Sequence, residues 1–308
     1  MKTTVWCLVV AISVSAVTVA SKSNSTEESP NEGKRSSWGG LPKPSFFVGS
    51  EPPVGLPGID QGTEIQQGTP PFFFSLFDTS TNTPFYSAYK VLPWQAKSLG
   101  KYKRRKNTHW RIPLGVSSLN KAYKQANVEA RSKYKNQLTR GHMNPSAINS
   151  FNTNFMKATF TLTNAVPQFE ASNSGPWQEF ERKIRNYAKT TCGSQTRQGT
   201  LYLLTGRSEN GLKGVTKPFI TNTFKVATKT LRLDTPRAVW TAGCCVWMET
   251  GKPKAESFAV MSNNHYNKTK LHQTQMNVTA LEKYLRAATN VNLFPGNPDC
   301  AQNYHPLP

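Results

Sequence analysis

A group of polar side chains between residues 139 and 185 has the composition of a hydrolytic site. Residues 139–145 read Thr-Arg-Gly-His-Met-Asn-Pro, which sets Arg140 two positions before His142. A neutral imidazole accepts a proton from water near neutral pH, because its ordinary pKa is about 6.5. The guanidinium of Arg140 offers a fork of N–H donors that suits a charged phosphate oxygen. This segment therefore predicts a base beside an anion-binding group.

A second group belongs to one predicted helix, which we expect to start at Gly-Pro 175–176 and to run to about Lys189. Asn173 precedes this start, and its amide oxygen is a neutral hard ligand for Mg²⁺. Glu181 and Arg185 are four residues apart and share one helix face with Trp177. Each feature also has an ordinary explanation, as a helix cap, an ion pair or a hydrogen-bonded histidine. Their occurrence together and in order is what indicates a site.

The charge balance points to a polyanionic partner. The chain of 308 residues has 38 Lys+Arg against 17 Asp+Glu, a formal charge of +21. Such a surface attracts nucleic acid, anionic glycan or anionic lipid. The run at 101–106 contains Lys103, Arg104 and Arg105, which either contact phosphate or form a solvated loop. Asp is scarce, and this scarcity counts against a site of several carboxylates around paired metals.

The elements that must position these residues mix strands and helices without strict βαβ alternation, which predicts an α+β fold. We expect a flexible segment at 21–65 and one domain at 66–308, with a mixed, mainly antiparallel sheet and flanking helices. Strands are predicted at 72–77, 85–89, 160–163, 201–205 and 238–241. Further helices are predicted at 118–135 and at 279–288, the latter with Thr279 as its N-cap.

These motifs resemble the DNA/RNA non-specific endonucleases, whose ββα-metal site usually carries the motif D-R-G-H. The match includes residues 140–146, Asn-Ala-Val-Pro-Gln at 164–168, and the series Asn173, Trp177, Glu181. Segments 86–89, 124–126, 236–245 and 293–296 are similar to the secreted animal branch called endonuclease domain-containing 1-like. The resemblance covers about residues 66–300.

The resemblance implies a role for each candidate residue. His142 would be the general base that activates water, and Asn173 the single protein ligand of a hydrated Mg²⁺, with Mn²⁺ as another suitable ion. Glu181 would support the water shell of the metal, while Arg140 and Arg185 would neutralise phosphate charge. Position 139 departs from the family, since Thr139 stands where Asp is usual. We expect this change to alter the orientation of the site or the rate.

Two functions are compatible with these residues. The first is a Mg²⁺-dependent, sugar-nonspecific endonuclease that hydrolyses phosphodiester bonds of DNA and RNA. The second is a catalytically weak protein that retains the fold and binds nucleic acid or anionic glycan through its charge. Retention of His142, Asn173 and Glu181 together favours the enzyme. The sequence does not indicate an oligomeric state.

The N-terminus predicts secretion without stable membrane association. Residues 1–20 have the form of a signal peptide, with Lys2 before an apolar run. In an oxidising compartment the four later cysteines would form two disulfides. Cys244 and Cys245 are neighbours and poorly placed to bond each other, so Cys192 and Cys300 each pair with one of them, in either order. Triplets beginning at Asn24, Asn267 and Asn277 are candidate glycosylation sites.

Overall fold

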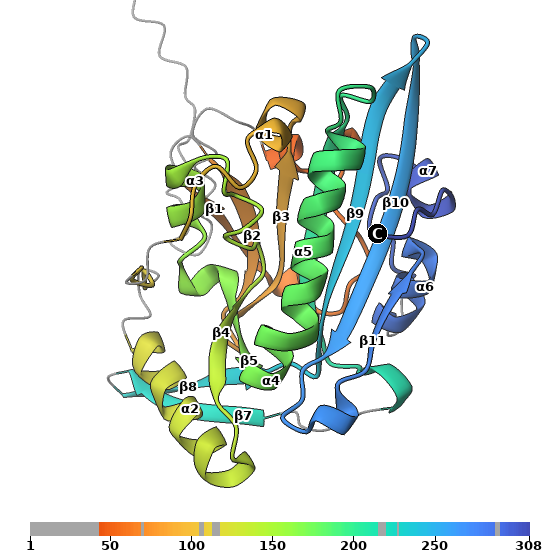
Figure 1. The fold of residues 1–308 in the computed structure, drawn as a ribbon. Helices are drawn as coiled ribbons and strands as arrows, with labels where there is room; N and C mark the ends of the chain where they lie inside the picture. Colours follow the sequence, from red (N-terminus) through yellow and green to blue (C-terminus); the bar gives the residue numbers. More distant parts are fainter. Residues whose placement is uncertain are drawn as a thin grey trace, which may run out of the picture.

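A seven-stranded antiparallel sheet forms the centre of the fold (Figure 1). The computed structural model describes residues 43–68, 71–104, 108–112, 118–214, 220–226, 228–286 and 290–308. The strands lie in the order β1 (Thr63–Gln67), β2 (Phe73–Asp78), β3 (Thr83–Val91), β6 (Thr200–Ser208), β9 (Ala238–Glu249), β10 (Lys252–Asn263) and β11 (Gln273–Met276). Every neighbouring pair is antiparallel, so the α+β prediction with a mainly antiparallel sheet is confirmed.

Both faces of this sheet are covered. Helices cover one face, and two other helices together with the N-terminal residues 43–65 cover the other. Helix α5 (Gln178–Tyr187) lies across one face (Figure 1) and buries Phe180 and Ile184 against it. Helices α1 (Pro93–Lys97) and α3 (Thr153–Ala158) belong to the same side. Helices α6 (Val278–Leu285) and α7 (Asp299–Gln302) pack on the opposite face. Because both faces are covered, the central strands are almost entirely buried rather than alternately exposed.

The flexible segment predicted at 21–65 is wrong for its described part, residues 43–65. Phe46, Phe47, Val48 and Leu56 are buried in the core cluster that also contains Trp240. Phe46, Phe47 and Val48 are consecutive, and Gly and Pro residues separate them from Leu56, so the segment lacks the periodicity that marks a helix or strand. Its apolar side chains are ordered by tertiary contact instead. Residues 21–42 and the predicted signal peptide lie outside the described residues.

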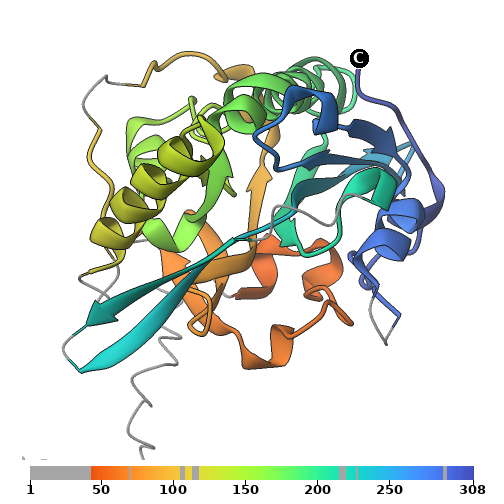
Figure 2. The ribbon, with the colours of Figure 1, turned by 90° about the horizontal axis from the view of Figure 1, so that it is seen from below.

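A smaller layer carries the candidate site. Strands β4 (Leu138–His142) and β5 (Ala165–Phe169) form a two-stranded antiparallel pair, and helix α4 (Glu170–Ser172) follows β5 directly. Helix α2 (Leu119–Tyr134) packs on this pair through a third core cluster that includes Leu119, Ala126 and Phe169. The same cluster holds Leu233 of the hairpin formed by β7 (Ile220–Val226) and β8 (Lys229–Thr235). Seen from below, this hairpin projects from the body of the protein (Figure 2).

Most predicted elements are present, with two corrections. Predicted segments 72–77, 85–89, 201–205 and 238–241 lie in strands β2, β3, β6 and β9, and the helices near 118–135 and 279–288 are α2 and α6. The N-cap of α6 is Asn277 rather than Thr279, because the Asn277 side chain accepts from the amide of Ala280. The strand at 160–163 is wrong. It is replaced by a single bridge at Thr161 and a 3₁₀ turn at Leu162–Asn164.

The helix predicted from Gly-Pro 175–176 starts earlier. Helical backbone begins with α4 and passes through a π-helical turn at Asn173–Trp177 before α5. Gly175 departs from helical geometry inside this turn, with φ −116° and ψ −113°. Pro176 follows it and needs no backbone donor. Asn173 is therefore part of a widened helical turn, a feature that is frequent at functional sites.

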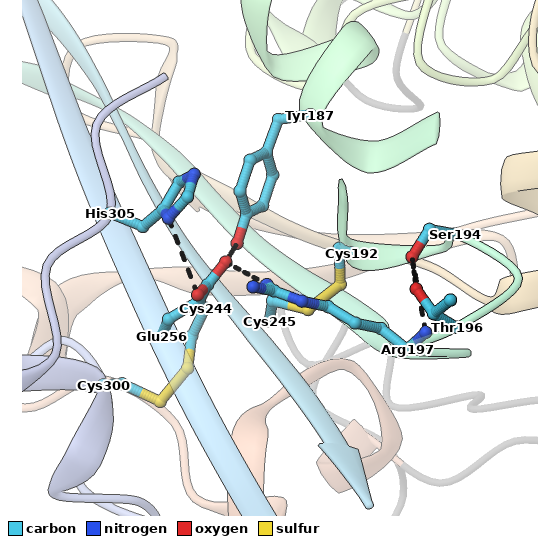
Figure 3. The surroundings of a disulfide bond; sticks show 10 residues. All are labelled: Tyr187, Cys192, Ser194, Thr196, Arg197, Cys244, Cys245, Glu256, Cys300 and His305. Carbon is cyan, nitrogen blue, oxygen red and sulfur yellow. Dashed lines mark hydrogen bonds and ion pairs between the residues drawn. A yellow bond between two sulfur atoms is a disulfide. The ribbon is translucent and has the colours of Figure 1, made fainter. Parts of the chain in front are cut away.

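Two disulfides join the sheet to its flanking elements (Figure 3). Cys192 bonds Cys245, and Cys244 bonds Cys300, which resolves the two pairings that the sequence left open. Neighbouring residues on a strand point to opposite faces. Cys245 therefore belongs to the core cluster on the α5 side and Cys244 to the cluster on the α7 side. The adjacent residues Cys244 and Cys245 therefore connect β9 covalently to elements on both faces of the sheet.

A partly buried carboxylate lies beside the disulfides (Figure 3). Glu256 of β10 accepts a hydrogen bond of 2.6 Å from the Tyr187 hydroxyl and pairs with the guanidinium of Arg197. The Nδ1 atom of His305 lies 3.6 Å from the same carboxylate. Arg197 also lies over the Trp247 ring, 4.6 Å from its centroid. The cluster connects the end of α5, the sheet and the C-terminal segment.

Two surface properties bear on the predicted location of the protein. No helix within the described ranges is long and apolar enough to cross a membrane. Asn267 and Asn277 are exposed, and the side-chain oxygen of each accepts a hydrogen bond from one backbone amide. Asn24 lies outside the described residues.

Candidate active site

Strands β4 and β5 and the helical segment α4–α5 bring the predicted residues to one cavity. His142 ends β4 and pairs with Ala165, the first residue of β5. Because Phe169 pairs with Leu138 and α4 follows β5 at once, the helical segment begins beside the start of β4, and Asn173 contacts Thr139 of this strand. The cavity measures about 540 Å³. Its described lining includes Arg104, His142, Ser146, Ala147, Asn173, Ser174, Gly175, Gln178, Glu179, Glu181, Arg182 and Arg185.

The side chain of Asn173 is oriented by Thr139. Asn173 Nδ2 donates to Thr139 Oγ1 over 2.9 Å, and the same hydroxyl donates to the carbonyl oxygen of Gln168 over 2.9 Å. Since the Thr139 hydrogen is committed to Gln168, its oxygen must accept from Asn173. The nitrogen end of the amide therefore faces β4, and Oδ1 is the end available to a ligand in the cavity.

His142 is an enclosed imidazole. Its ring centroid lies 4.6 Å from that of Trp110 and 4.8 Å from that of Phe160. Nε2 is buried and has no hydrogen-bond partner among the described residues, so Nδ1 is the nitrogen left to face the cavity. Burial, and secondly the positive charge of Arg104, lower the pKa of His142 to about 3. The ring is therefore neutral at physiological pH.

Glu181 has the opposite perturbation. Burial raises the pKa of this carboxyl to about 8, because the charged form loses hydration. The indole N–H of Trp177 opposes the rise, although its geometry falls outside that of a full hydrogen bond. In turn, burial and the Glu181 charge raise the pKa of Tyr89. A cation placed beside this carboxyl would favour its ionised form and lower its pKa.

Arg185 lies in the cavity and Arg140 does not. Arg185 is one helical turn from Glu181 and lines the same cavity. Arg140 precedes His142 by two strand residues, which is about 6.8 Å along β4, and its Nη2 donates to Asn120 Oδ1 of α2. Its guanidinium lies over the ring of Tyr123, 5.5 Å from the centroid. Burial lowers the pKa of Arg140. Of the two arginines predicted to neutralise phosphate charge, only Arg185 is among the described lining residues of the cavity.

The basic run reaches the cavity through Arg104. This residue lines the cavity of His142 and also two neighbouring cavities of about 460 and 490 Å³. Its guanidinium lies 4.8 Å from the Phe160 ring centroid. Lys103 lines the two neighbouring cavities, and Arg105 lies outside the described residues. Of the two alternatives for the run, this placement favours a contact role for Arg104.

Three further residues shape the site, and two of them, Gly141 and Asn164, belong to the motifs found in the sequence. Trp110 contacts the ring of His142, although it lies far from the motif and outside any predicted element. Asn164 fixes the turn after His142, since its Oδ1 accepts from the amide of Asn144 over 2.8 Å and its Nδ2 donates to the carbonyl of Asn144 over 3.0 Å. Gly141 is required for packing, because a Cβ there would lie 2.1 Å from Gln168 Oε1.

Comparisons with known proteins identify the family of the chain. The chain is 41% identical over 78 residues to "Nuclease EXOG, mitochondrial" of Xenopus laevis, a match that covers 25% of this chain and 22% of that relative. Its fold is similar to a chain in the crystal structure of the EndoG/EndoGI complex. That likeness has a TM-score of 0.51 at 13% identity and covers 75% of this chain and 87% of the other. The model of the DNA/RNA non-specific endonuclease family matches residues 55–299, and the chain belongs to this family of phosphodiester hydrolases.

Proposed function

We propose that this protein is a secreted, Mg²⁺-dependent endonuclease that hydrolyses phosphodiester bonds in DNA and RNA without sugar specificity. The observation that carries the proposal is the presence of a neutral imidazole, a carboxamide oxygen, a carboxyl and a guanidinium in one cavity. They belong to His142, Asn173, Glu181 and Arg185. Neither a glycan-binding nor a purely structural role requires these four groups to converge.

The donor set fits a hydrated divalent metal. The family is metal-dependent in general, and within the described ranges no three His, Cys, Asp or Glu side chains gather to hold an ion. Mg²⁺ keeps several waters and needs only one or two protein oxygens, which Asn173 Oδ1 and the nearby Glu181 carboxylate can supply directly or through water. A bound ion would stabilise negative charge on the phosphate and the leaving oxygen. Mn²⁺ suits the same oxygens.

The residues of the chain supply the remaining chemistry. Neutral His142 accepts the proton of the attacking water at Nδ1, while the enclosing rings of Trp110 and Phe160 hold the imidazole in place. Arg185 and Arg104 provide positive charge around the phosphate, which lowers the free energy of the doubly negative transition state. Contacts to phosphate do not distinguish one base sequence from another, so a site that recognises its substrate through phosphate would cleave both DNA and RNA without sequence specificity.

Secretion is supported by the cysteines. Two disulfides are typical of oxidising compartments, and residues 1–20 have signal-peptide composition. Loss of those residues would remove Lys2 and no acid, which changes the net charge only from +21 to +20. Expression in secretory cells, followed by N-terminal sequencing of the protein in the medium, tests this part of the proposal.

Plasmid cleavage tests the activity. We expect Mg²⁺ to support nicking, EDTA to abolish it, and His142→Ala to reduce the rate by at least about 100-fold. His272→Ala is the matched control, because His272 lies outside the cavity lining. If the wild-type protein binds DNA but never cuts it, the enzyme hypothesis fails and the chain is a catalytically weak polyanion-binding protein. Equal cutting by His142→Ala would remove His142 from the mechanism.

A further inference from the structure

A stripe of four cations runs along the outer face of helix α2. Lys121, Lys124 and Arg131 recur at helical spacing, Lys135 follows as the C-cap of the helix, and all four are exposed. The opposite face of the helix buries Leu119, Ala122, Tyr123, Ala126 and Ala130. At a rise of about 1.5 Å per residue, the helical part from Lys121 to Arg131 is about 15 Å long. We name these four residues the α2 stripe.

The α2 stripe has no acidic partner within the described part of the chain. Glu129 is the one acid of the helix, and it accepts a hydrogen bond from Asn222 of β7 instead. Exposed helices commonly place acids and bases three or four residues apart, and like charges at that spacing repel one another. A polyanion bound along the stripe would remove this repulsion.

A groove beside the stripe has the chemistry of a phosphate contact. It lies between α2 and the β7–β8 hairpin, measures about 350 Å³ and includes Lys121 and Lys225. The other described lining residues are Ser118, Gln125, Thr223 and Thr230. Ammonium, hydroxyl and amide groups are the usual partners of phosphate and sugar oxygens. The projecting hairpin in Figure 2 extends this surface away from the body.

The stripe is joined to the active site by direct contacts. Asn120, in the first turn of α2, accepts a hydrogen bond from Arg140. The Arg140 guanidinium lies 6.0 Å from the centroid of Trp110, and that ring lies 4.6 Å from the ring of His142. The start of α2 is therefore connected to the ring of His142 through Arg140 and Trp110, so a linear polymer that extends beyond the catalytic cavity on this side meets α2.

We propose that the α2 stripe and its groove bind the sugar–phosphate backbone of the nucleic acid substrate outside the catalytic cavity. The inference rests on the proposed function, because it takes the occupant of the cavity to be nucleic acid. Continuity with the cavity favours this occupant over a separate anionic glycan. The stripe contributes affinity for long substrates and leaves the hydrolytic step unchanged.

Salt-dependent binding tests the proposal. Fluorescence anisotropy in EDTA would measure the dissociation constant of a 30-base-pair duplex at several salt concentrations. We compare wild type with Lys121→Gln/Lys124→Gln/Arg131→Gln. Each lost phosphate contact lowers the slope of log K against log salt by about 0.9, so the triple variant should lose about 2 to 3 units of slope. The exposed triple Lys252→Gln/Lys254→Gln/Lys283→Gln, on β10 and α6, has the same charge change and should lose less than 1.

Cleavage separates this proposal from the proposed function. The stripe variant should cleave a dinucleotide with the same kcat/KM as wild type, but should lose at least tenfold in kcat/KM on the duplex. Equal slopes for the stripe and control variants, with cleavage intact, would overturn the stripe and leave the nuclease standing. Wild-type protein that binds the duplex through the stripe but never cleaves it would overturn the nuclease activity and leave the stripe as a nucleic acid-binding surface. Loss of heparin binding without loss of duplex binding would assign the surface to a glycan and overturn the proposal.

Discussion

The carboxamide of Asn173 donates to the hydroxyl of Thr139 over 2.9 Å. This contact gives a function to the residue by which the chain departs from its family. A carboxylate at position 139 can accept from Asn173, but it cannot also donate to the carbonyl of Gln168 as the hydroxyl does. Thr139 therefore orients the amide without adding a negative charge to the site.

Replacement of Thr139 tests this orientation. In Thr139→Val the shape is retained and both hydrogen bonds are lost, so the Asn173 amide is free to rotate. Loss of a group that orients a metal ligand typically weakens metal affinity by about 10- to 100-fold. We expect that loss in Mn²⁺ binding measured by electron paramagnetic resonance and in the Mg²⁺ dependence of cleavage. Thr139→Ser keeps the hydroxyl and should bind Mn²⁺ like wild type, whereas unchanged affinity in Thr139→Val would assign Thr139 a packing role only.

Sequence patterns located the candidate site residues but not their surroundings. His142, Asn173, Glu181 and Arg185 stand out in two short motifs, at 139–145 and 173–185, and the structure brings them to one cavity. Arg140 shares the same motif but is held by Asn120, because the direction of a side chain depends on a helix that lies earlier in the chain.

The fold was predictable to a similar degree. Strands with continuous apolar runs, such as β2 and β9, were recognised from composition. Phe46 and Phe47 were missed because their order comes from contacts with β2 and Trp240 rather than from local periodicity. The segment at 160–163 was predicted to be a strand. In the structure, the buried side-chain amide of Asn164 donates to the carbonyl oxygens of Asn144 and Thr159, and the chain turns there. Such long-range polar contacts leave no periodic pattern.

Glu181 should make stability depend on pH. Its pKa is about 8 in the folded protein against an ordinary value of 4.5, so the unfolded chain releases a proton that the folded protein retains between these values. The free energy of unfolding therefore falls as pH rises through this window, by about 1.4 kcal/mol for each pKa unit. Glu181→Gln removes the effect. We expect its Tm to exceed that of wild type at pH 8 and to match it near pH 4.5, in calorimetry without metal.

The exposed Glu179 provides the control for this measurement. Glu179→Gln also removes one carboxylate from α5, but Glu179 pairs with Arg182 at the surface, where ion pairs contribute little. Its Tm should follow the wild-type curve with pH. A Glu181→Gln protein that is less stable than wild type at pH 8 would contradict the burial argument.

Each disulfide should contribute comparably to stability. The loops that they close span 53 and 56 residues, and removal of a native disulfide typically costs about 2–5 kcal/mol. We expect Cys192→Ala/Cys245→Ala and Cys244→Ala/Cys300→Ala to lower the free energy of urea unfolding by similar amounts. Peptide mapping of the unreduced wild type checks the pairing itself. Recovery of a Cys192–Cys244 peptide would refute it.

Arg104 should depress the pKa of His142. Burial is the larger cause of the value of about 3, and the Arg104 charge adds to it, so Arg104→Gln should raise the pKa while leaving it below 6.5. The pKa can be followed by NMR of the labelled imidazole during an acid titration. A histidine whose folded pKa is lowered stabilises the protein above pH 6.5, and that stability is lost as pH falls toward 3. The variant should therefore also resist acid unfolding to a lower pH than wild type.

Lys103→Gln is the control for this prediction. It removes a neighbouring cation that does not line the catalytic cavity, and it should change the pKa of His142 less than Arg104→Gln does. An equal shift in both variants would mean that His142 responds to net charge rather than to contact with Arg104.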